Sequence, residues 1–267
     1  MTHKPEQVRD LQRLLRELKR IVVAYSGGVD SAVLLAVAVQ ELGDNVLAVT
    51  GRSESLAQGE LESASEVARL LSARHEVIET AEFDDPSYRA NPKNRCFYCK
   101  NELFSRLQQI AHERGFAHVV DGFNADDGTS TLDVRPGHEA GVALGVRSPL
   151  AEAGLGKTAI RALAQTFGLP VWNKPATPCL SSRVPYGTAI EVDDLRRIDL
   201  AERYLRALGY EVVRVRHFGA TAKIEVPATQ VPRLMASQGS ISRALRSVGY
   251  EHVEIDSRGY RTGSLNE

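Results

Sequence analysis

The sequence predicts an α/β protein in which a parallel β-sheet covered by helices is followed by a smaller α+β domain. Three observations lead to this fold class. Short β-branched or apolar runs alternate with longer segments of helical period as far as residue 167. Polar loops follow three of the short runs, which is where ligands bind in open parallel sheets. The stretch from residue 168 to 187 holds four prolines and has no hydrophobic period, as is typical of a linker.

The first domain is expected to cover residues 1–187. Its first segment carries Leu11, Leu15 and Leu18 at helical spacing, whereas Ile21 to Tyr25 is a short apolar run typical of a buried parallel strand. We expect strands at 21–25, 46–50, 76–78 and 118–121, and helices at 6–20, 31–42, 60–71, 100–113 and 157–167. Strands separated by helices imply right-handed crossovers and a Rossmann-like parallel sheet.

The second domain is expected to cover residues 188–267. Its hydrophobic pattern changes between helical and strand periods without the strict alternation of the first domain. We expect helices at 193–208, 231–238 and 241–248, and strands at 211–215, 222–226 and 252–255. This order indicates a small α+β domain.

Charge and composition limit the classes of partner. Lys plus Arg (33) nearly balance Asp plus Glu (34), which argues against sequence-independent nucleic-acid binding. No stretch approaches the roughly 18 apolar residues of a membrane span, and the N-terminus has no apolar run of signal-peptide type. Three cysteines are too few for a secreted disulfide framework. We therefore expect a cytoplasmic protein with neither a membrane nor a nucleic-acid partner.

The segment S-G-G-V-D-S, from Ser26 to Ser31, predicts an anion-binding loop. It lies between an expected strand and an expected helix, so that backbone N–H groups and the positive helix end point at bound oxygens. Gly27 and Gly28 can adopt positive φ and leave room for a ligand, while the two serines add hydroxyl donors. Asp30 would repel phosphate unless a cation, most simply Mg²⁺, lay between them.

This segment resembles the PP-loop of the N-type ATP pyrophosphatases, whose pattern S-G-G-x-D-S it matches at every fixed position. The resemblance implies an adenine-nucleotide alpha hydrolase-like fold that cleaves ATP to AMP and pyrophosphate and transfers AMP to a substrate oxygen. The later segment D-G-F-N-A-D-D resembles a second loop of that superfamily, which implies nucleotide or metal contacts for Asn124, Asp126 and Asp127. Taken alone, those three residues are more typical of turns than of nucleotide or metal contacts.

A second phosphate-binding motif is incomplete. The segment G-L-G-K-T, from Gly154 to Thr158, matches the end of a Walker A motif, but Ala151 stands where the first glycine is required. We therefore assign Gly156 to Thr158 to the start of a helix.

The cysteines indicate sulfur or metal chemistry. Cys96 and Cys99 form a C-x-x-C pair, which fits half a zinc site, part of an iron–sulfur site or a redox pair. Lys174 and Arg183 lie on either side of Cys179 in the sequence, and such positive charges favour the thiolate form of a cysteine. We therefore take Cys179, Asp30 and Arg183 as the candidate catalytic residues.

Several segments together resemble the LarE family, the sulfur transferases of nickel-pincer nucleotide biosynthesis. They are R-C-F-Y-C-K, D-G-F-N-A-D-D, R-P-G, G-V-R-S-P-L, P-C-L-S-S-R-V-P-Y-G, V-R-V-R-H-F-G and the ending Y-R-T-G-S-L-N-E. The resemblance implies that ATP adenylates the carboxylates of pyridinium-3,5-biscarboxylic acid mononucleotide and that sulfur then displaces AMP. In one version of the family the cysteine at the position of Cys179 gives up its own sulfur. In the three-cysteine version, which this sequence matches better, Cys96, Cys99 and Cys179 would hold a [4Fe–4S] cluster that carries the transferred sulfide.

The same resemblance assigns roles in the second domain. Arg214 and Arg216 would anchor the phosphate of the substrate nucleotide, and their alternation on a strand places them on one side of it. Glu202 and Glu225 would bind a divalent cation. The resemblance also implies a homo-oligomer, with a hexamer as the candidate assembly.

Three alternatives remain open on the sequence. A tRNA thiolase also joins a PP-loop to three cysteines, but it would need a surface that binds RNA. An amide-forming synthetase would use ammonia and would have no need of Cys179. A nucleotide-binding module without catalytic activity would have no need of Asp30.

Overall fold

A computed structural model describes residues 6–127 and 136–261. The chain divides into two compact units. The first consists of Met1–Ser53, Gly59–Tyr88 and Asn94–Thr177, and the second of Glu54–Gln58, Arg89–Lys93 and Pro178–Glu267. The sequence predicts a boundary after residue 187, whereas the second unit takes up the chain from Pro178 and so contains Cys179. Arg135 of the R-P-G segment and the chain after Arg261 lie outside the described residues.

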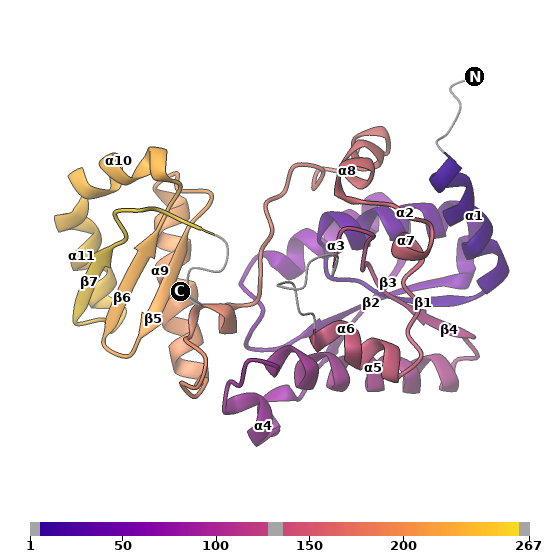
Figure 1. The fold of residues 1–267 in the computed structure, drawn as a ribbon, viewed down its shortest axis with the longest axis horizontal. Helices are drawn as coiled ribbons and strands as arrows, with labels where there is room; N and C mark the ends of the chain where they lie inside the picture. The colour runs from indigo at the N-terminus through magenta and orange to yellow at the C-terminus, as the bar shows by residue number, and fades with distance from the viewer. Residues whose placement is uncertain (1–5, 128–135, 262–267) are drawn as a thin grey trace. The chain divides into compact units, whose positions relative to one another are not determined.

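The first unit is built on a parallel sheet, which confirms the predicted fold class (Figure 1). Its strands are β1 (Ile21–Ala24), β2 (Val46–Arg52), β3 (Arg74–Glu79) and β4 (His118–Val120), in the order β3-β2-β1-β4. The pairs β1–β2, β1–β4 and β2–β3 are all parallel. The order reverses between β1 and β4, and such a switch point is where parallel sheets bind ligands.

Helices cover both faces of this sheet, because alternate strand residues point to opposite sides. The helices of this part of the chain are α1 (Glu6–Leu18), α2 (Val29–Leu42), α3 (Glu60–Leu70), α4 (Pro86–Arg89), α5 (Arg95–Glu113), α6 (Pro136–Ala143), α7 (Pro149–Glu152) and α8 (Lys157–Thr166). One face, which includes Ile21 and Val23, packs against α1, α2, α3 and α8. The opposite face, which includes Val22, packs against α5 through Phe104 and Leu107.

Short 3₁₀ turns complete the described part of the chain. They are η1 (Gly43–Asn45), η2 (Glu82–Asp84), η3 (Leu180–Arg183) and η4 (Ala228–Gln230). Of these, η3 directly follows Cys179 and therefore shapes the loop that presents it.

The second unit has a separate core around a mixed three-stranded sheet. Its elements are α9 (Val192–Ala207), β5 (Arg214–Phe218), β6 (Thr221–Glu225), α10 (Val231–Ala236), α11 (Gln238–Ser247) and β7 (His252–Ile255). Strand β6 is central, antiparallel to β5 and parallel to β7. The strand predicted at 211–215 is placed too early, because it begins at Arg214 and runs to Phe218.

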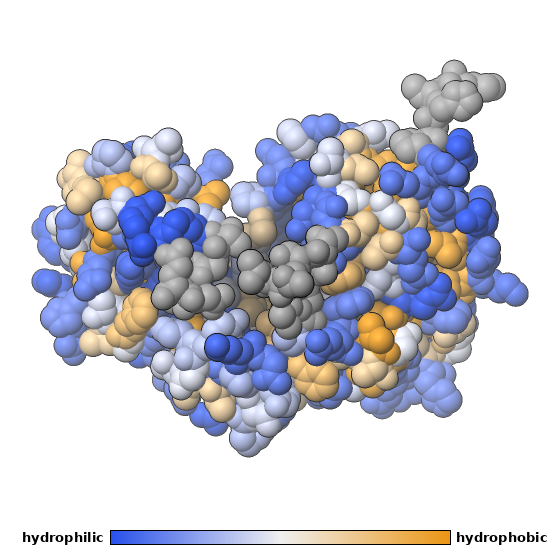
Figure 2. Space-filling model, in the orientation of Figure 1, coloured by the Kyte–Doolittle hydropathy of each residue, from blue (hydrophilic) through white to orange (hydrophobic). Residues whose placement is uncertain are grey.

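Within the described residues, no helix is long and apolar enough to cross a membrane. On the face shown in Figure 2, hydrophilic residues surround smaller hydrophobic patches.

Candidate active site

The PP-loop segment leaves β1 and enters α2 through a glycine turn. Gly27 has a φ of +71°, and a Cβ added there would lie 2.7 Å from the Cβ of Ala64 on α3. Only glycine meets both conditions without strain. Gly28 takes the N-cap position of α2 at a φ of −76°, so the predicted positive φ occurs at Gly27 and not at Gly28. With glycine at the N-cap, no side chain caps the first turn of α2 by a hydrogen bond, which suits the binding of an anion by its N–H groups.

The two serines of the loop fix its shape. Their Oγ atoms lie 3.1 Å apart, and Ser31 Oγ donates to the carbonyl of Gly28 at 3.2 Å. Ser26 Oγ in turn accepts from the Gly28 N–H at 3.4 Å. The loop is thus held in one conformation by its own hydroxyl groups, which limits the rearrangement that anion binding would require.

The loop after β4 packs directly on the PP-loop, as the switch-point argument predicts. A Cβ at Gly122 would lie 2.9 Å from the Ser31 nitrogen, so the glycine permits this close approach. The amide nitrogen of Asn124, which is fully buried, donates to Asp30 Oδ2 at 3.3 Å and to Asp127 Oδ2 at 2.8 Å. The fold therefore brings together two carboxylates from segments that are almost a hundred residues apart.

Asp30 is the group in this cluster that suits a cation. Burial, and then the negative charge of Asp127, raise the pKa of Asp30, while Lys157 opposes the shift. Its Oδ1 atom is buried and has no hydrogen-bond partner within residues 6–127 and 136–261. An orphaned carboxylate oxygen beside an anion-binding loop fits Mg²⁺, which takes oxygen ligands and bridges carboxylates to phosphates.

Sequence reasoning missed Lys157. As predicted, a helix starts here, since Asp126 Oδ2 accepts from the backbone N–H of Lys157 at 2.6 Å at the start of α8. The lysine side chain, however, extends to the acidic cluster, and its Nζ lies 3.2 Å from Asp127 Oδ1. Gly156 leaves room for the Asp126 carboxylate, because a Cβ there would lie 2.6 Å from Asp126 Oδ1. In the sequence, the only sign that Lys157 belongs to the site was its place after Gly156 in the incomplete Walker segment.

Cys96 and Cys99 lie on the first turn of α5, not in a loop before the helix as the expected start at residue 100 implied. Three residues apart on a helix, they share one face, near the positive helix end that favours thiolates. Cys96 is exposed and Cys99 is half-buried. Both belong to the first unit and Cys179 to the second. Among described residues, no group of three or more His, Cys, Asp or Glu side chains is already arranged around a metal position.

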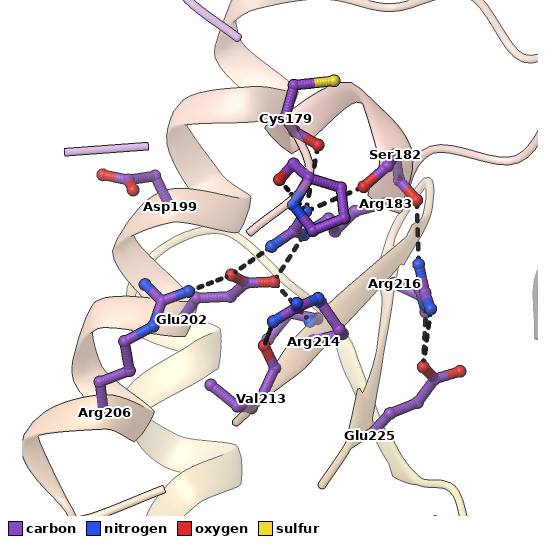
Figure 3. Close-up of polar contacts among 12 residues, drawn as sticks. Cys179, Ser182, Arg183, Asp199, Glu202, Arg206, Val213, Arg214, Arg216 and Glu225 are labelled. Atoms are coloured by element: carbon purple, nitrogen blue, oxygen red, sulfur yellow. Dashed lines mark hydrogen bonds and ion pairs between the residues drawn. The ribbon is translucent and has the colours of Figure 1, made fainter. Parts of the chain in front are cut away.

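The Cys179 loop is fastened by Arg183, which is fully buried (Figure 3). The Arg183 guanidinium forms a bidentate ion pair with Glu202, with N–O distances of 2.8 and 2.9 Å. Its Nη1 atom donates to the carbonyls of Pro178 (2.6 Å) and Cys179 (3.0 Å). The Cys179 thiol points away from the guanidinium, as Figure 3 shows.

Arg214 and Arg216 lie on β5, both nearly buried. Burial, followed by the charge of Arg183, lowers the pKa of Arg214. Arg216 binds Glu225 Oε2 through Nε (3.0 Å) and Nη2 (2.9 Å) and donates from Nη1 to the Ser182 carbonyl at 2.9 Å. Glu202 and Glu225 thus both accept from arginines, and their predicted cation site stays a prediction.

A serine- and glycine-lined loop at the switch point of a parallel sheet, with a half-buried aspartate whose Oδ1 atom suits Mg²⁺, defines an ATP-using enzyme of the PP-loop class. The family described as "Queuosine biosynthesis protein QueC" matches residues 20–96, which include this loop. The pyridinium-3,5-bisthiocarboxylic acid mononucleotide synthase of Lactiplantibacillus plantarum is 39% identical over 95% of this chain and 91% of its own length. The chain therefore belongs to the LarE family.

Two uncharacterized proteins are also similar over nearly the full length. One, from Synechocystis sp., is 44% identical over 97% of both chains. The other, from Methanocaldococcus jannaschii, is 27% identical over 91% of this chain and 92% of its own. The similarity thus extends through both units.

Proposed function

We propose that this enzyme adenylates the carboxylates of pyridinium-3,5-biscarboxylic acid mononucleotide with ATP and then replaces AMP by sulfur, which gives thiocarboxylates. The observation that carries the proposal is the hydrogen bond from Asn124 to Asp30, which joins the loop after β4 to the PP-loop. It is supported by a relative that is named for the bisthiocarboxylic product. Adenylation is needed because a free carboxylate has no adequate leaving group, whereas AMP leaves readily when a thiolate or sulfide attacks.

In the nucleotide site, Ser26, Gly27, Gly28 and Ser31 would bind the triphosphate through hydroxyl and backbone donors. Asp30 and Asp127 would hold Mg²⁺, which would neutralise charge on the leaving pyrophosphate. Asn124 keeps the two carboxylates in place by donating to both. Asp126 would act indirectly: it accepts from the Lys157 N–H at the start of α8 and so helps to position the Lys157 side chain.

For the sulfur, we propose that Cys96, Cys99 and Cys179 bind a [4Fe–4S] cluster. The pair on one face of α5 supports this role, because both thiols can then reach the same group. Three thiolates would leave one iron without a protein ligand, and that iron could carry the sulfide to be transferred. The alternative is that Cys179 donates its own sulfur and is consumed.

The second unit would bind the substrate. Arg214 and Arg216 are the proposed anchors for its phosphate, since guanidinium groups bind phosphate oxygens in pairs. We further propose that the enzyme works in the cytoplasm as a homo-oligomer, with a hexamer as the candidate, and that Glu225 binds a divalent cation when its arginine is engaged by substrate.

One anaerobic experiment tests the proposal. The purified protein is supplied with ATP, Mg²⁺ and the dicarboxylate mononucleotide, and pyrophosphate and thiocarboxylate are measured together. Wild type should form both products. Cys179→Ala should still release pyrophosphate but form no thiocarboxylate, whereas an amide-forming synthetase would be unaffected by this change. Asp30→Asn should form neither product.

The sulfur source follows from the same samples. Bound iron with an unchanged polypeptide mass after turnover supports the cluster, while loss of one sulfur and two hydrogens from Cys179 would establish the consumed cysteine. Salt-sensitive binding of bulk tRNA, together with absence of thiocarboxylate, would favour the tRNA thiolase instead.

A further inference from the structure

One of the side chains that hold the loop presenting Cys179 is fully buried, namely that of Arg183. Besides the two carbonyls at Pro178 and Cys179, Arg183 Nη1 lies 2.8 Å from Ser182 Oγ. The exposed fraction of Arg183 is zero, so its guanidinium faces protein on all sides. A group in this position cannot touch a substrate, although it can determine where its neighbours lie.

Glu202 fixes the direction of that guanidinium. The carboxylate is fully buried on α9, and its oxygens also accept from Arg206 Nη2 at 2.6 Å and from the Val215 N–H at 3.0 Å. Burial on its own would raise the pKa of Glu202, but the hydrogen bonds and charges of Arg183 and Arg206 hold it below the ordinary value. Both carboxylate oxygens are therefore occupied, and Glu202 joins η3, α9 and β5 (Figure 3).

A cation ligand would make different demands on Glu202. A divalent ion would have to displace Arg183 from the carboxylate, which would leave a buried guanidinium without its anion. The planar guanidinium of Arg183, by contrast, suits these contacts. Two of its nitrogens bind the Glu202 carboxylate while the third binds the loop carbonyls. A lysine ammonium cannot do both.

We propose that Arg183 and Glu202 form an internal anchor that positions Cys179 for sulfur transfer, and that Arg183 is a positioning residue and not a catalytic one. Arg216 supports the same loop from the other side, through the Ser182 carbonyl. The inference rests on the proposed function only in that Cys179 is the working thiol. It holds whether the thiol binds a cluster or is consumed.

Amide hydrogen exchange and kinetics of the full-length Arg183→Lys variant test the anchor. The Ser182 N–H donates to the Cys179 carbonyl at 2.9 Å, and the Val184 N–H donates to the Ser181 carbonyl at 3.1 Å. Both amides therefore report on opening of the loop. We expect these amides to exchange at least about tenfold faster in the variant. The kcat for thiocarboxylate formation should fall about tenfold while KM for the nucleotide stays within about twofold, since only the alignment of the thiol is lost.

Arg206→Gln is the matched control. It removes one positive charge from the same carboxylate, but among the described residues Arg206 makes no hydrogen bond or ion pair with the loop, so exchange at Ser182 and Val184 should stay at the wild-type rate. Ser182→Ala removes one loop contact without unpairing a buried charge, and about a two- to threefold faster exchange is expected even if Arg183→Lys folds poorly.

Four results would overturn the anchor. Unchanged loop exchange in Arg183→Lys would do so, and so would equal acceleration in Arg206→Gln, which would indicate general destabilisation. A fall in kcat without faster exchange would mean that the guanidinium acts on the reacting groups. A change in Mg²⁺ requirement of Glu202→Gln would restore the cation role. Exchange is measured without substrate, so failure of the proposed function would leave this test intact.

Discussion

Single charged residues set the protonation state of the nucleotide site. Asp30 can bind Mg²⁺ only as a carboxylate, and its pKa is raised by burial and by Asp127. Lys157 opposes this shift through its positive charge. ATP cleavage should therefore fall as pH decreases through the raised pKa of Asp30, at a higher pH than an ordinary aspartate would give.

Two substitutions should move that acid limb in opposite directions. Asp127→Asn removes a negative charge and lowers the pKa of Asp30, so the limb should move to lower pH by about half to one pH unit, whereas Lys157→Ala should move it upward by a similar amount. The measurement is the pH at which pyrophosphate release falls to half of each variant's own maximum, with Mg²⁺ limiting, because bound Mg²⁺ lowers the pKa of a carboxylate that holds it. Movement in the same direction for both variants would show that a group other than Asp30 controls the limb.

At the residue scale, the sequence predicted those site residues that lie together in one continuous segment. Ser26 to Ser31 was identifiable because its donors and its carboxylate occur within six positions of one motif. The roles of Lys157 and Glu202 were not, because each depends on a partner from a distant segment. Asp127 is 30 residues from Lys157 in the chain, and Arg183 is 19 residues from Glu202. No local pattern records such pairs.

At the scale of elements, hydrophobic period predicted the sheet and most helices, since each buries an apolar face. The start of α5 was placed five residues late, because its first turn, from Arg95, has little apolar pattern and presents cysteines instead. The start of β5 was placed too early because Val212 and Val213 read as strand residues. At β5 the error arises because Val213 is buried in the core, as a strand residue would be, although the strand begins only at Arg214.

The contact between the PP-loop and α3 depends on Gly27. Gly27→Ala should destabilise the protein by about 1–3 kcal/mol, because it forces a side chain into positive φ and against Ala64. Gly239→Ala is the control, because a Cβ there meets nothing within 4 Å and the residue lies in α11. That change should be neutral or stabilise by up to about 1 kcal/mol. Urea unfolding followed by circular dichroism measures both, and equal effects would contradict the packing argument.

At the scale of the whole molecule, each unit has its own core, so its elements could be predicted separately from their own periods. The boundary could not, because Glu54–Gln58 and Arg89–Lys93 join the second unit through hydrogen bonds such as that from Leu180 N to Ser55 O at 2.8 Å. Short segments of this kind carry no hydrophobic period that assigns them to either core.

Stability and function should oppose each other across the first unit. Because the folded pKa of Asp30 is raised, its ionised form destabilises the fold, and this penalty is relieved as pH falls through the folded pKa. Asp30→Asn should therefore stabilise the first unit at pH 7 by roughly 1 kcal/mol, with Asn124 still able to donate to the new side chain. The gain should shrink toward pH 4.

Fluorescence of Trp172, the single tryptophan and a residue of the first unit, reports this unfolding in urea. The same variant should lose Mg²⁺-dependent pyrophosphate release by at least about a hundredfold, because the carboxylate proposed to hold Mg²⁺ is gone. Asp44→Asn, at an exposed position, should change neither property. If Asp30→Asn were no more stable than wild type at pH 7, the claim that the ionised Asp30 carboxylate destabilises the fold would be wrong.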